Sequence, residues 1–510
     1  MKRGAAAAAI TVAAAVAIVY ALVEGRYGIF INELYFIVCG RHPAFGYVDQ
    51  PPVVPLLSAL MTLGGVNLWV LRLPAFLAGV LLVPLVVLFA QELGASTRGA
   101  WLAAVASVTC SLVTAMSGTL STSTFEPFDF TATAFLATRA IARNNGRAWW
   151  IAGAFVGFAF ETKYSVLFWA IGLAVGIAAC GPRSVFRSRD LWIGIAIAVI
   201  LALPNAIWQL AHGLPFLELV HNDNPGNFIG TPVGFAIGQI FITNLVLAPL
   251  WIAALIAPFA SERLAPFRYL AVTFIVFVAI VYVTHGKAYY MAGAYPTLFA
   301  LGAAACTQLP RWLIGAWAVL ATANAALALP FVLPVESPQA LKANLDRMTF
   351  RPRPMEAAGI GAPLMQVFSD EFGWPQLAHT VEQSYAALPP SLRSHAAIYA
   401  ATYGEAAAID VYGHGLPPAL SGNNQYYLWG PRGYDGSVVL AVNEDPAKWA
   451  AFCTSVRIVG YYGDSPYAMP FDTHRPILLC LGMHPPLPQL WPQFKHYGVE
   501  FPGRFDLPRV

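Results

Sequence analysis

The sequence predicts a polytopic α-helical membrane protein that ends in a smaller α/β domain outside the cytoplasm. Hydrophobic residues make up 58% of the 510 positions and charged residues only 11%, whereas soluble proteins carry about 25% charged residues. The charges are also spread unevenly, with 28 in residues 1–333 and 27 in the much shorter segment 334–510. This composition excludes an ordinary soluble enzyme. It predicts a membrane domain over 1–333 and an α/β domain over 334–510.

Apolar runs close to the roughly 20 residues that cross a bilayer recur through residues 1–333. Many spans follow the first run, so we interpret that run as a retained helix and not as a signal peptide. Polar interruptions divide this part of the chain into about eleven expected spans, at 5–23, 73–90, 100–117, 127–142, 149–161, 164–180, 191–209, 235–257, 269–284, 291–309 and 312–333.

The basic residues predict the orientation of these spans. With a cytoplasmic N-terminus, the inner loops hold 12 Lys and Arg residues and the outer loops hold five, which is the bias expected of cytoplasmic loops. An odd number of spans then places 334–510 outside the cytoplasm. The net charge of +3, without a basic stripe, predicts no nucleic-acid partner.

Carboxylates show the opposite bias, since most of them fall on the outer side. Carboxylates at the ends of apolar helices are costly unless they are paired, hydrated or bound to cations. Some are expected to be solvated loop residues, but a group that converges with Lys163 and Lys287 would form a catalytic or ion-binding cavity. The outer carboxylates are Glu24, Glu33, Asp49, Glu126, Asp129, Glu161, Glu218 and Asp223.

The first outer loop, residues 24–66, is unusually long. Its apolar stretch Val53–Leu63 is too short to span, so we expect an amphipathic helix along the membrane surface. The preceding Pro51-Pro52 would fix the entry into that helix and hold Asp49 at the surface.

The segment 334–510 has the mixed pattern of a small α/β domain. We expect a strand at His395–Ala401, a helix that begins at Tyr403, and strands at Thr454–Tyr462 and Pro476–Cys480. Cys453 and Cys480 would form a disulfide if this segment is extracytoplasmic; two free buried thiols are the alternative.

Several short motifs occur in a recognisable order and cover nearly the whole chain. This order resembles the bacterial family 39 glycosyltransferases, relatives of the protein O-mannosyltransferases and of the enzymes that add aminoarabinose to lipid A. The motifs are Asn32-Glu33-Leu34-Tyr35-Phe36, Arg41-His42-Pro43, Gly46-Tyr47-Val48-Asp49-Gln50-Pro51-Pro52, Ser123-Thr124-Phe125-Glu126-Pro127, Thr162-Lys163-Tyr164-Ser165, Leu203-Pro204-Asn205-Ala206-Ile207-Trp208-Gln209, Gly286-Lys287-Ala288-Tyr289-Tyr290, Tyr403-Gly404-Glu405-Ala406 and Tyr427-Leu428-Trp429-Gly430-Pro431.

The resemblance implies a GT-C-like fold in the bacterial inner membrane. It also implies an enzyme that takes a sugar from a polyprenyl-phosphate carrier and moves it, with inversion, to a lipid, glycan or protein acceptor on the periplasmic side. Such a displacement needs a carboxylate to take the acceptor's proton. It also needs cationic groups or a divalent metal ion to stabilise the departing phosphate.

The resemblance implies residue roles with one departure from the family pattern. The family usually has Asp-Glu where this chain has Asn32-Glu33, and asparagine accepts no proton at neutral pH. Glu33 is therefore the first candidate for the base, with Asp49 or Glu126 as alternatives. Asp49 matches the carboxylate that relatives place near the donor phosphate, and it is the candidate ligand for a divalent metal ion. The expected substrate-binding residues are Asn32, Arg41, His42, Gln50, Glu126, Lys163, Tyr164, Lys287, Tyr289 and Tyr290.

Two other hypotheses stay open. A transporter or flippase of lipid-linked sugars also needs many spans, although transporters often consist of two similar halves and no such repeat is found. A non-catalytic relative that only binds the lipid-linked sugar is the other hypothesis, because of Asn32.

Overall fold

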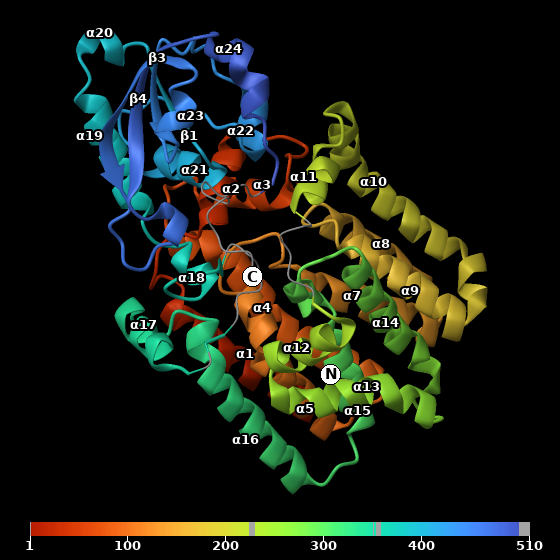
Figure 1. Ribbon diagram of the computed structural model, residues 1–510. Coiled ribbons are helices and arrows are strands. Elements are labelled where there is room, and N and C mark those ends of the chain that lie inside the picture. Colours follow the sequence, from red (N-terminus) through yellow and green to blue (C-terminus); the bar gives the residue numbers. More distant parts are fainter. Residues whose placement is uncertain (1, 224–229, 350, 353–358, 499–510) are drawn as a thin grey trace.

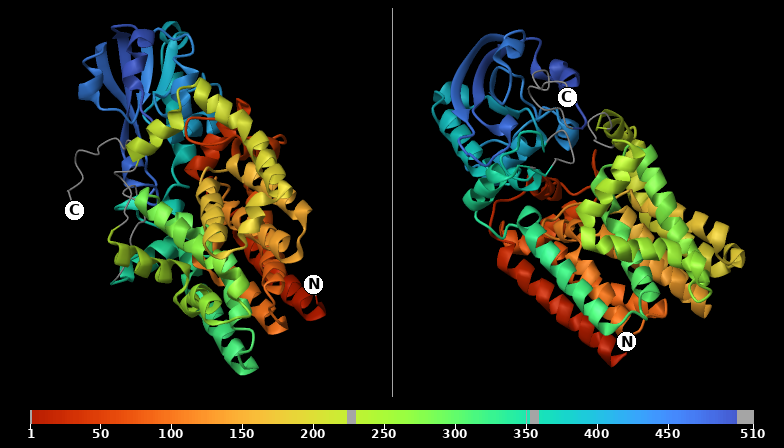
Figure 2. Two further views of the ribbon diagram at one scale, coloured as in Figure 1. Left: turned by 90° about the vertical axis from the view of Figure 1, so that its right-hand side faces the viewer. Right: turned by 60° about the horizontal axis from the view of Figure 1, so that its bottom comes forward.

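The computed structural model describes residues 2–223, 230–349, 351–352 and 359–498 (Figure 1). Long helices form a bundle, and the C-terminal part of the chain forms a sheet with flanking helices at one end of it. Figure 2 shows the N-terminus at the opposite end of the bundle from the sheet. The bundle helices are α1 (Arg3–Val23), α4 (Leu68–Glu92), α5 (Thr97–Thr109), α6 (Ser111–Met116), α7 (Glu126–Arg143), α8 (Gly146–Phe160), α9 (Val166–Cys180), α10 (Arg189–Ala211), α12 (Pro232–Thr243), α13 (Ala248–Ala260), α14 (Arg268–Val283), α15 (Tyr295–Ala305) and α16 (Arg311–Ala328).

Each of the expected spans falls on one of these helices or on a pair of them. Among the described residues, five helices are long and apolar enough to cross a membrane, or six if the bent pair α12 and α13 is one span. The multi-span character of residues 1–333 therefore agrees with the sequence analysis. The number eleven stays a prediction, because several of the helices are shorter than a bilayer is thick.

The expected continuous spans over 100–117 and 235–257 are wrong in detail. The first breaks at Cys110, between α5 and α6, and the second bends by 105° between α12 and α13. The bend lies at Asn244, whose φ is +110°, a value that no helical residue adopts. The Asn244 side chain accepts a hydrogen bond from the N–H of Val246 at 3.0 Å, so it also caps the turn that follows.

Three short helices lie between the bundle and the C-terminal segment. They are α2 (Ile31–Arg41), α3 (Val53–Met61) and α11 (Pro215–Asp223). Helix α3 confirms the helix expected after Pro51-Pro52, with Pro52 just before its first residue. The N–H of Val53 donates to the carbonyl oxygen of Glu161 at 3.0 Å, which ties the start of α3 to the end of α8.

The C-terminal segment contains a four-stranded mixed sheet of order β1-β2-β4-β3. The strands are β1 (Ala396–Ala400), β2 (Val438–Val442), β3 (Cys453–Tyr462) and β4 (Arg475–Met483). Strands β1 and β2 are parallel, and the other neighbours are antiparallel. The strands expected near 395–401, 454–462 and 476–480 are confirmed, whereas β2 was not predicted.

Both faces of the sheet are buried along β1, β2 and the middle of β4, whereas most of the edge strand β3 is exposed. Helices α19 (Trp374–Ala386) and α21 (Tyr403–Tyr412) cover one face, in a core that also contains α2. The other face packs against α23 (Pro446–Trp449), α24 (Leu487–Leu490) and the turn after them. Shorter helices complete the segment: α17 (Pro338–Arg347), α18 (Gln366–Ser369), α20 (Pro390–Arg393) and α22 (Asn424–Trp429).

Helix α21 packs directly on α2, which joins the C-terminal segment to the bundle. A side chain at Gly404 would lie 2.4 Å from the side chain of Ile31. The helices approach this closely because position 404 has no side chain.

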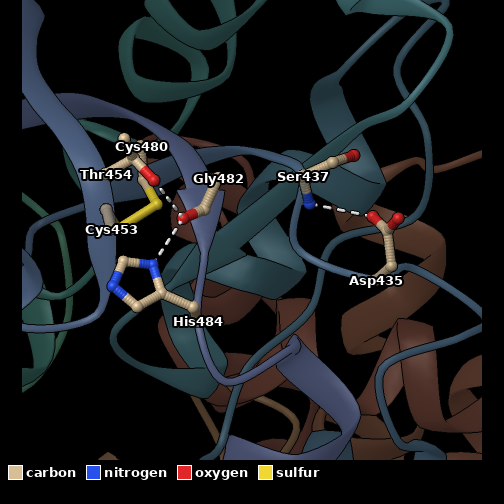
Figure 3. Close-up of a disulfide and its surroundings, with 7 residues drawn as sticks. All are labelled: Asp435, Ser437, Cys453, Thr454, Cys480, Gly482 and His484. Atoms are coloured by element: carbon tan, nitrogen blue, oxygen red, sulfur yellow. Dashed lines mark hydrogen bonds between the residues drawn. A yellow bond between two sulfur atoms is a disulfide. The ribbon is translucent and has the colours of Figure 1, made fainter.

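The disulfide expected between Cys453 and Cys480 is present and links β3 to β4 (Figure 3). Beside it, the carbonyl oxygen of Gly482 accepts hydrogen bonds from Thr454 Oγ1 and His484 Nδ1, both at 3.0 Å.

Candidate functional site

Many of the predicted site residues lie where the bundle meets the C-terminal segment. We use the name junction site for Asn32, Asp49, Lys163, Asp223, Lys287, Tyr290 and Tyr403. They come from α2, the loop before α3, the turn between α8 and α9, the end of α11, the turn after α14, and the start of α21. These charged and hydroxyl groups are half-buried.

Asp49 is a half-buried carboxylate with a hydroxyl donor and a raised pKa. Its Oδ1 accepts a hydrogen bond of 2.9 Å from the Tyr35 hydroxyl. Loss of hydration raises the pKa of Asp49 to about 7, although the Tyr35 hydrogen bond opposes the rise, and the nearby Asp223 carboxylate raises it further. A base with a pKa near the working pH is the most effective proton acceptor.

The C-terminal segment orients the hydrogen-bond donor of Asp49. The N–H of Gln425 donates to the Tyr35 hydroxyl oxygen at 3.0 Å, and Gln425 Oε1 accepts from the N–H of Val48 at 3.1 Å. The Tyr35 hydroxyl is therefore held between Gln425 and Asp49, which keeps its hydrogen directed at the carboxylate.

Tyr403, which the sequence left without a role, interacts with four other members of the junction site, namely Asn32, Asp49, Asp223 and Lys287. Its hydroxyl donates to Asn32 Oδ1 at 2.8 Å, and its ring centre is 4.7 Å from that of Tyr35. Burial raises the pKa of Tyr403 well above its ordinary value; Asp49 raises it further and Lys287 opposes the rise. Tyr403 therefore shares one electrostatic environment with Asp49 and Lys287.

Lys163 supplies the second cation of the site. Its Nζ donates to Glu126 Oε2 at 3.0 Å and to Ser123 Oγ at 2.7 Å. The same ammonium lies 3.8 Å from the centre of the Tyr290 ring, a cation–π contact, and 5.8 Å from that of Tyr289. Ser165 also donates to Glu126. Each oxygen of Glu126 therefore has a partner, and Glu126 holds the Lys163 ammonium in position.

Glu33, the first candidate for the base, is a structural carboxylate in this fold. It is fully buried, and its two oxygens accept from Arg72 Nε and Nη2, each at 2.9 Å. They also accept from the N–H groups of Leu120 and Phe30 at 2.9 and 3.0 Å. No oxygen is left for an acceptor hydroxyl, so we do not carry the base role of Glu33 forward.

Arg41 and His42 lie at the other end of α2 from Asn32. Arg41 Nη1 donates to the carbonyl oxygen of Asp410 at 2.8 Å, and the His42 ring centre is 4.8 Å from that of Trp429. Both line a separate cavity of about 230 Å³ against the C-terminal segment. The structure therefore does not place them with Asp49 and Lys163.

Gln50 and Tyr164 belong to the scaffold of the outer loop. Gln50 is 1% exposed, and its side-chain nitrogen faces Cys39 Sγ at 4.0 Å. The Tyr164 hydroxyl donates to Asn205 Oδ1 at 2.7 Å and accepts from Gln209 Nε2 at 3.2 Å. Asn205 and Gln209 also donate to the backbone oxygens of Phe45 and Tyr47, respectively, so α10 holds the loop that carries Asp49.

Asp49 as a ligand of a divalent metal ion stays a prediction. Within the described ranges, no three His, Cys, Asp or Glu side chains converge in a way that could hold a metal ion. Asp49 and Asp223 are the two carboxylates that act on each other here. We derive no catalytic step through a metal.

Comparisons with known proteins identify the fold. The family model for dolichyl-phosphate-mannose-protein mannosyltransferases matches residues 49–208. The lipid A galacturonosyltransferase RgtD from Rhizobium johnstonii is 30% identical over 188 residues, which cover 36% of this chain and 39% of that protein. ArnT from Cupriavidus metallidurans bound to undecaprenyl phosphate has a TM-score of 0.62, at 14% identity, over 94% of this chain and 98% of that one. The chain therefore has the fold of ArnT.

The fold shared with solved structures extends beyond the region that the family model matches. The arabinofuranosyltransferase AftD from Mycobacteria has a TM-score of 0.50 at 14% identity, over 93% of this chain and 40% of that one. Asp49 and Lys163 lie inside the matched region 49–208. Asn32, Lys287 and Tyr403 lie outside it. The chain spans well under half of the galacturonosyltransferase in the alignment.

The sequence offered partial signals for the two site residues that it left without a role. Tyr403 begins the Tyr403-Gly404-Glu405-Ala406 motif, which contributes to the family resemblance but indicates no role for the tyrosine. Asp223 was among the outer carboxylates, but its closeness to Asp49 depends on the placement of α11.

Proposed function

We propose that the chain is a glycosyltransferase of the bacterial inner membrane that uses a polyprenyl-phosphate sugar as donor. It moves the sugar, with inversion, to a lipid, glycan or protein acceptor of the envelope on the periplasmic side. The observation that carries the proposal is a half-buried carboxylate, Asp49, with a pKa of about 7, in one electrostatic environment with Lys287. The names of the mannosyltransferase family and of RgtD, and the undecaprenyl phosphate bound to ArnT, support this class of reaction.

In the proposed reaction, an acceptor hydroxyl attacks the anomeric carbon of the donor sugar from the face opposite the phosphate. The new bond joins the acceptor oxygen to that carbon, and the bond between the carbon and the phosphate oxygen breaks with its electron pair. Asp49 takes the hydroxyl proton, and polyprenyl phosphate leaves.

The leaving phosphate needs positive charge beside it, because it gains negative charge as the bond breaks. Lys287 and Lys163 supply that charge. Glu126, Ser123 and Tyr290 hold the Lys163 ammonium in place, so little reorganisation is needed during the reaction. Asn32 has no proton to accept or lose at neutral pH, and we assign it the role of orienting the Tyr403 hydroxyl.

The disulfide supports a periplasmic position for the C-terminal segment. Disulfides persist in the bacterial periplasm and are rare in the cytosol. A periplasmic segment would place the junction site at the periplasmic surface of the membrane, where the head groups of lipid-linked sugars can reach it.

The test is a transfer assay with the purified full-length protein, radiolabelled polyprenyl-phosphate sugars and bacterial membrane extracts. We expect transfer by the wild type and its loss in Asp49→Asn, while Asp346→Asn, which changes an exposed carboxylate of α17, transfers normally. If the wild type releases no sugar from any donor, the enzyme proposal fails. That result would favour a non-catalytic protein that binds the lipid-linked sugar, or a transporter of it. If Asp49→Asn transfers normally, the assignment of the base fails.

A further inference from the structure

A groove lies between α5 and α16, far from the junction site. Figure 1 shows these two helices at the end of the bundle opposite the sheet. The groove has a volume of about 660 Å³. Its floor and walls come from α5, α16 and the turn that precedes α16, and none of the proposed catalytic residues lines it.

One end of the groove is basic. Arg98, in the first turn of α5, and Arg311, the first residue of α16, both line it. Both helices begin here, so their free backbone N–H groups add positive potential. The turn is held in place, because the N–H of Ser96 donates to Thr307 Oγ1 at 2.7 Å and Arg98 Nη1 donates to the carbonyl oxygen of Leu309 at 3.3 Å. None of the ion pairs found among the described residues involves Arg98 or Arg311.

The other end of the groove is apolar. Leu102, Val105, Ile314 and Ala318 line it. Helix α16 is a peripheral helix, since only 11% of its span is buried. Gly315 lies in the wall, and a Cβ at this position would meet no atom within 4 Å, so a missing side chain leaves the groove open.

We propose that this groove binds an anionic glycerophospholipid from the leaflet opposite the junction site. The phosphate lies between Arg98 and Arg311, and an acyl chain follows Leu102, Val105 and Ala318. Basic pockets between membrane helices suit anionic head groups, and each basic residue near the surface contributes about 1 kcal/mol of attraction. The apolar wall can contact an acyl chain, which free phosphate lacks, so the groove should bind a lipid more tightly than free phosphate. This lipid is neither the sugar donor nor the acceptor of the proposed reaction.

Native mass spectrometry of the detergent-purified full chain tests the proposal, with phosphatidylglycerol and phosphatidylcholine titrated separately. We expect phosphatidylglycerol to bind the wild type at least tenfold more tightly. The double variant Arg98→Gln/Arg311→Gln should lose this preference, and Gly315→Leu, which fills the apolar wall, should bind neither lipid in the groove. Free glycerol phosphate should not compete at concentrations comparable with that of the lipid.

Two matched controls separate the groove from general surface effects. Arg147→Gln removes an exposed arginine from the first turn of another bundle helix, α8. Gly238→Leu fills a second position in a helix, α12, where a Cβ meets no atom. Both should bind phosphatidylglycerol like the wild type. Equal binding of the two lipids to the wild type, or undiminished binding to Gly315→Leu or to a folded double variant, overturns the proposal.

Discussion

The guanidinium of Arg72, on α4, donates hydrogen bonds of 2.9 Å to both carboxylate oxygens of Glu33, on α2. Arg72 also lies 3.5 Å from Glu371 Oε1 of the C-terminal segment, and burial raises the pKa of Glu371 to about 8 even though Arg72 opposes the rise. One buried cation thus joins the bundle, the outer loop and the C-terminal segment. Substitution of Arg72 or of Glu33 should therefore lower the stability of the fold more than it lowers the rate of catalysis.

The first prediction concerns Glu33→Gln. Breaking a buried ion pair costs about 3–5 kcal/mol when the remaining charge is left without a partner, and the retained contact of Arg72 with Glu371 should keep the cost near the lower end of this range. We expect a lower free energy of unfolding, and activity per folded molecule close to that of the wild type below the unfolding temperature. Thermal unfolding in detergent and the transfer assay measure the two quantities. Asp346→Asn, which removes the exposed pair with Lys342, is the control and should cost less than about 1 kcal/mol. A stable but inactive Glu33→Gln would restore Glu33 as the base.

The second prediction is the pH dependence of Asp49. Only the ionised carboxylate accepts a proton, so kcat/KM of the wild type should rise with pH up to about 7. Asp49→Asn should lower kcat/KM by about 10²–10⁴-fold. Its kcat/KM should also no longer rise with pH below pH 7, so the acidic limb of the pH profile should be absent. Asp223→Asn should move the limb to lower pH, because the Asp223 carboxylate raises the pKa of Asp49. A wild-type limb near pH 4 would contradict the assignment.

The raised pKa of Asp49 also predicts how the stability of the protein changes with pH. Folding raises the pKa of Asp49 from 3.8 to about 7, so folding favours the protonated form. Its contribution is fully present below about pH 4 and is lost as the pH rises to about 7. Asp49→Asn should therefore unfold a few degrees above the wild type at pH 8, and at about the same temperature at pH 4. Lower stability of Asp49→Asn at pH 8 would show that the charged form is the one stabilised.

The sequence predicted the helices more completely than the site. Apolar runs and basic loops are local patterns, and each expected span coincides with a helix or a helix pair. The break at Asn244 was missed, because one residue with positive φ leaves the apolar pattern of α12 and α13 intact. Strand β2 was missed because Val438–Val442 is only five residues long and is buried on both faces, so it lacks the alternation of a half-buried strand.

The contacts of the candidate site depend on packing between distant segments. Arg72 and Glu33 are 39 residues apart, and Tyr403 and Asn32 are 371 residues apart. No pattern within one sequence distinguishes a carboxylate that will be saturated, such as Glu33, from one that will stay available, such as Asp49. The resemblance implied a role for both carboxylates, and only the fold shows that their hydrogen-bond partners differ.

The third prediction concerns the hydroxyl of Tyr403. Tyr403→Phe removes the hydrogen bond to Asn32 and leaves the ring packing on Tyr35 unchanged. We expect a folded protein whose kcat falls by about fivefold, since one neutral hydrogen bond is worth about 1 kcal/mol. The control is Tyr461→Phe, at a half-exposed tyrosine of β3. Unchanged kcat in Tyr403→Phe would remove Tyr403 from the site.

The fourth prediction tests Lys163 as a phosphate-binding cation. Lys163→Met alone leaves Glu126 buried without its counter-ion and should destabilise the protein. The double variant Lys163→Met/Glu126→Gln removes both charges, so it should fold and yet show a KM for the donor raised about tenfold. Lys342→Met, on the exposed face of α17, should leave that KM unchanged. Wild-type donor affinity in the double variant would show that Lys163 only neutralises Glu126.

The last prediction uses the disulfide to test the side of the membrane on which the C-terminal segment lies. Cys453→Ser/Cys480→Ser should lower the free energy of unfolding by about 3 kcal/mol, the value expected for a loop of this length. In cells lysed directly into denaturant, which exposes the two buried sulfurs, a thiol-reactive polymer should modify neither cysteine in the wild type unless a reductant is added first. Cys180→Ser, which changes a cysteine outside the disulfide, is the control for both measurements. Free thiols at 453 and 480 in untreated cells would indicate a cytosolic segment, because the oxidising periplasm would otherwise keep them paired.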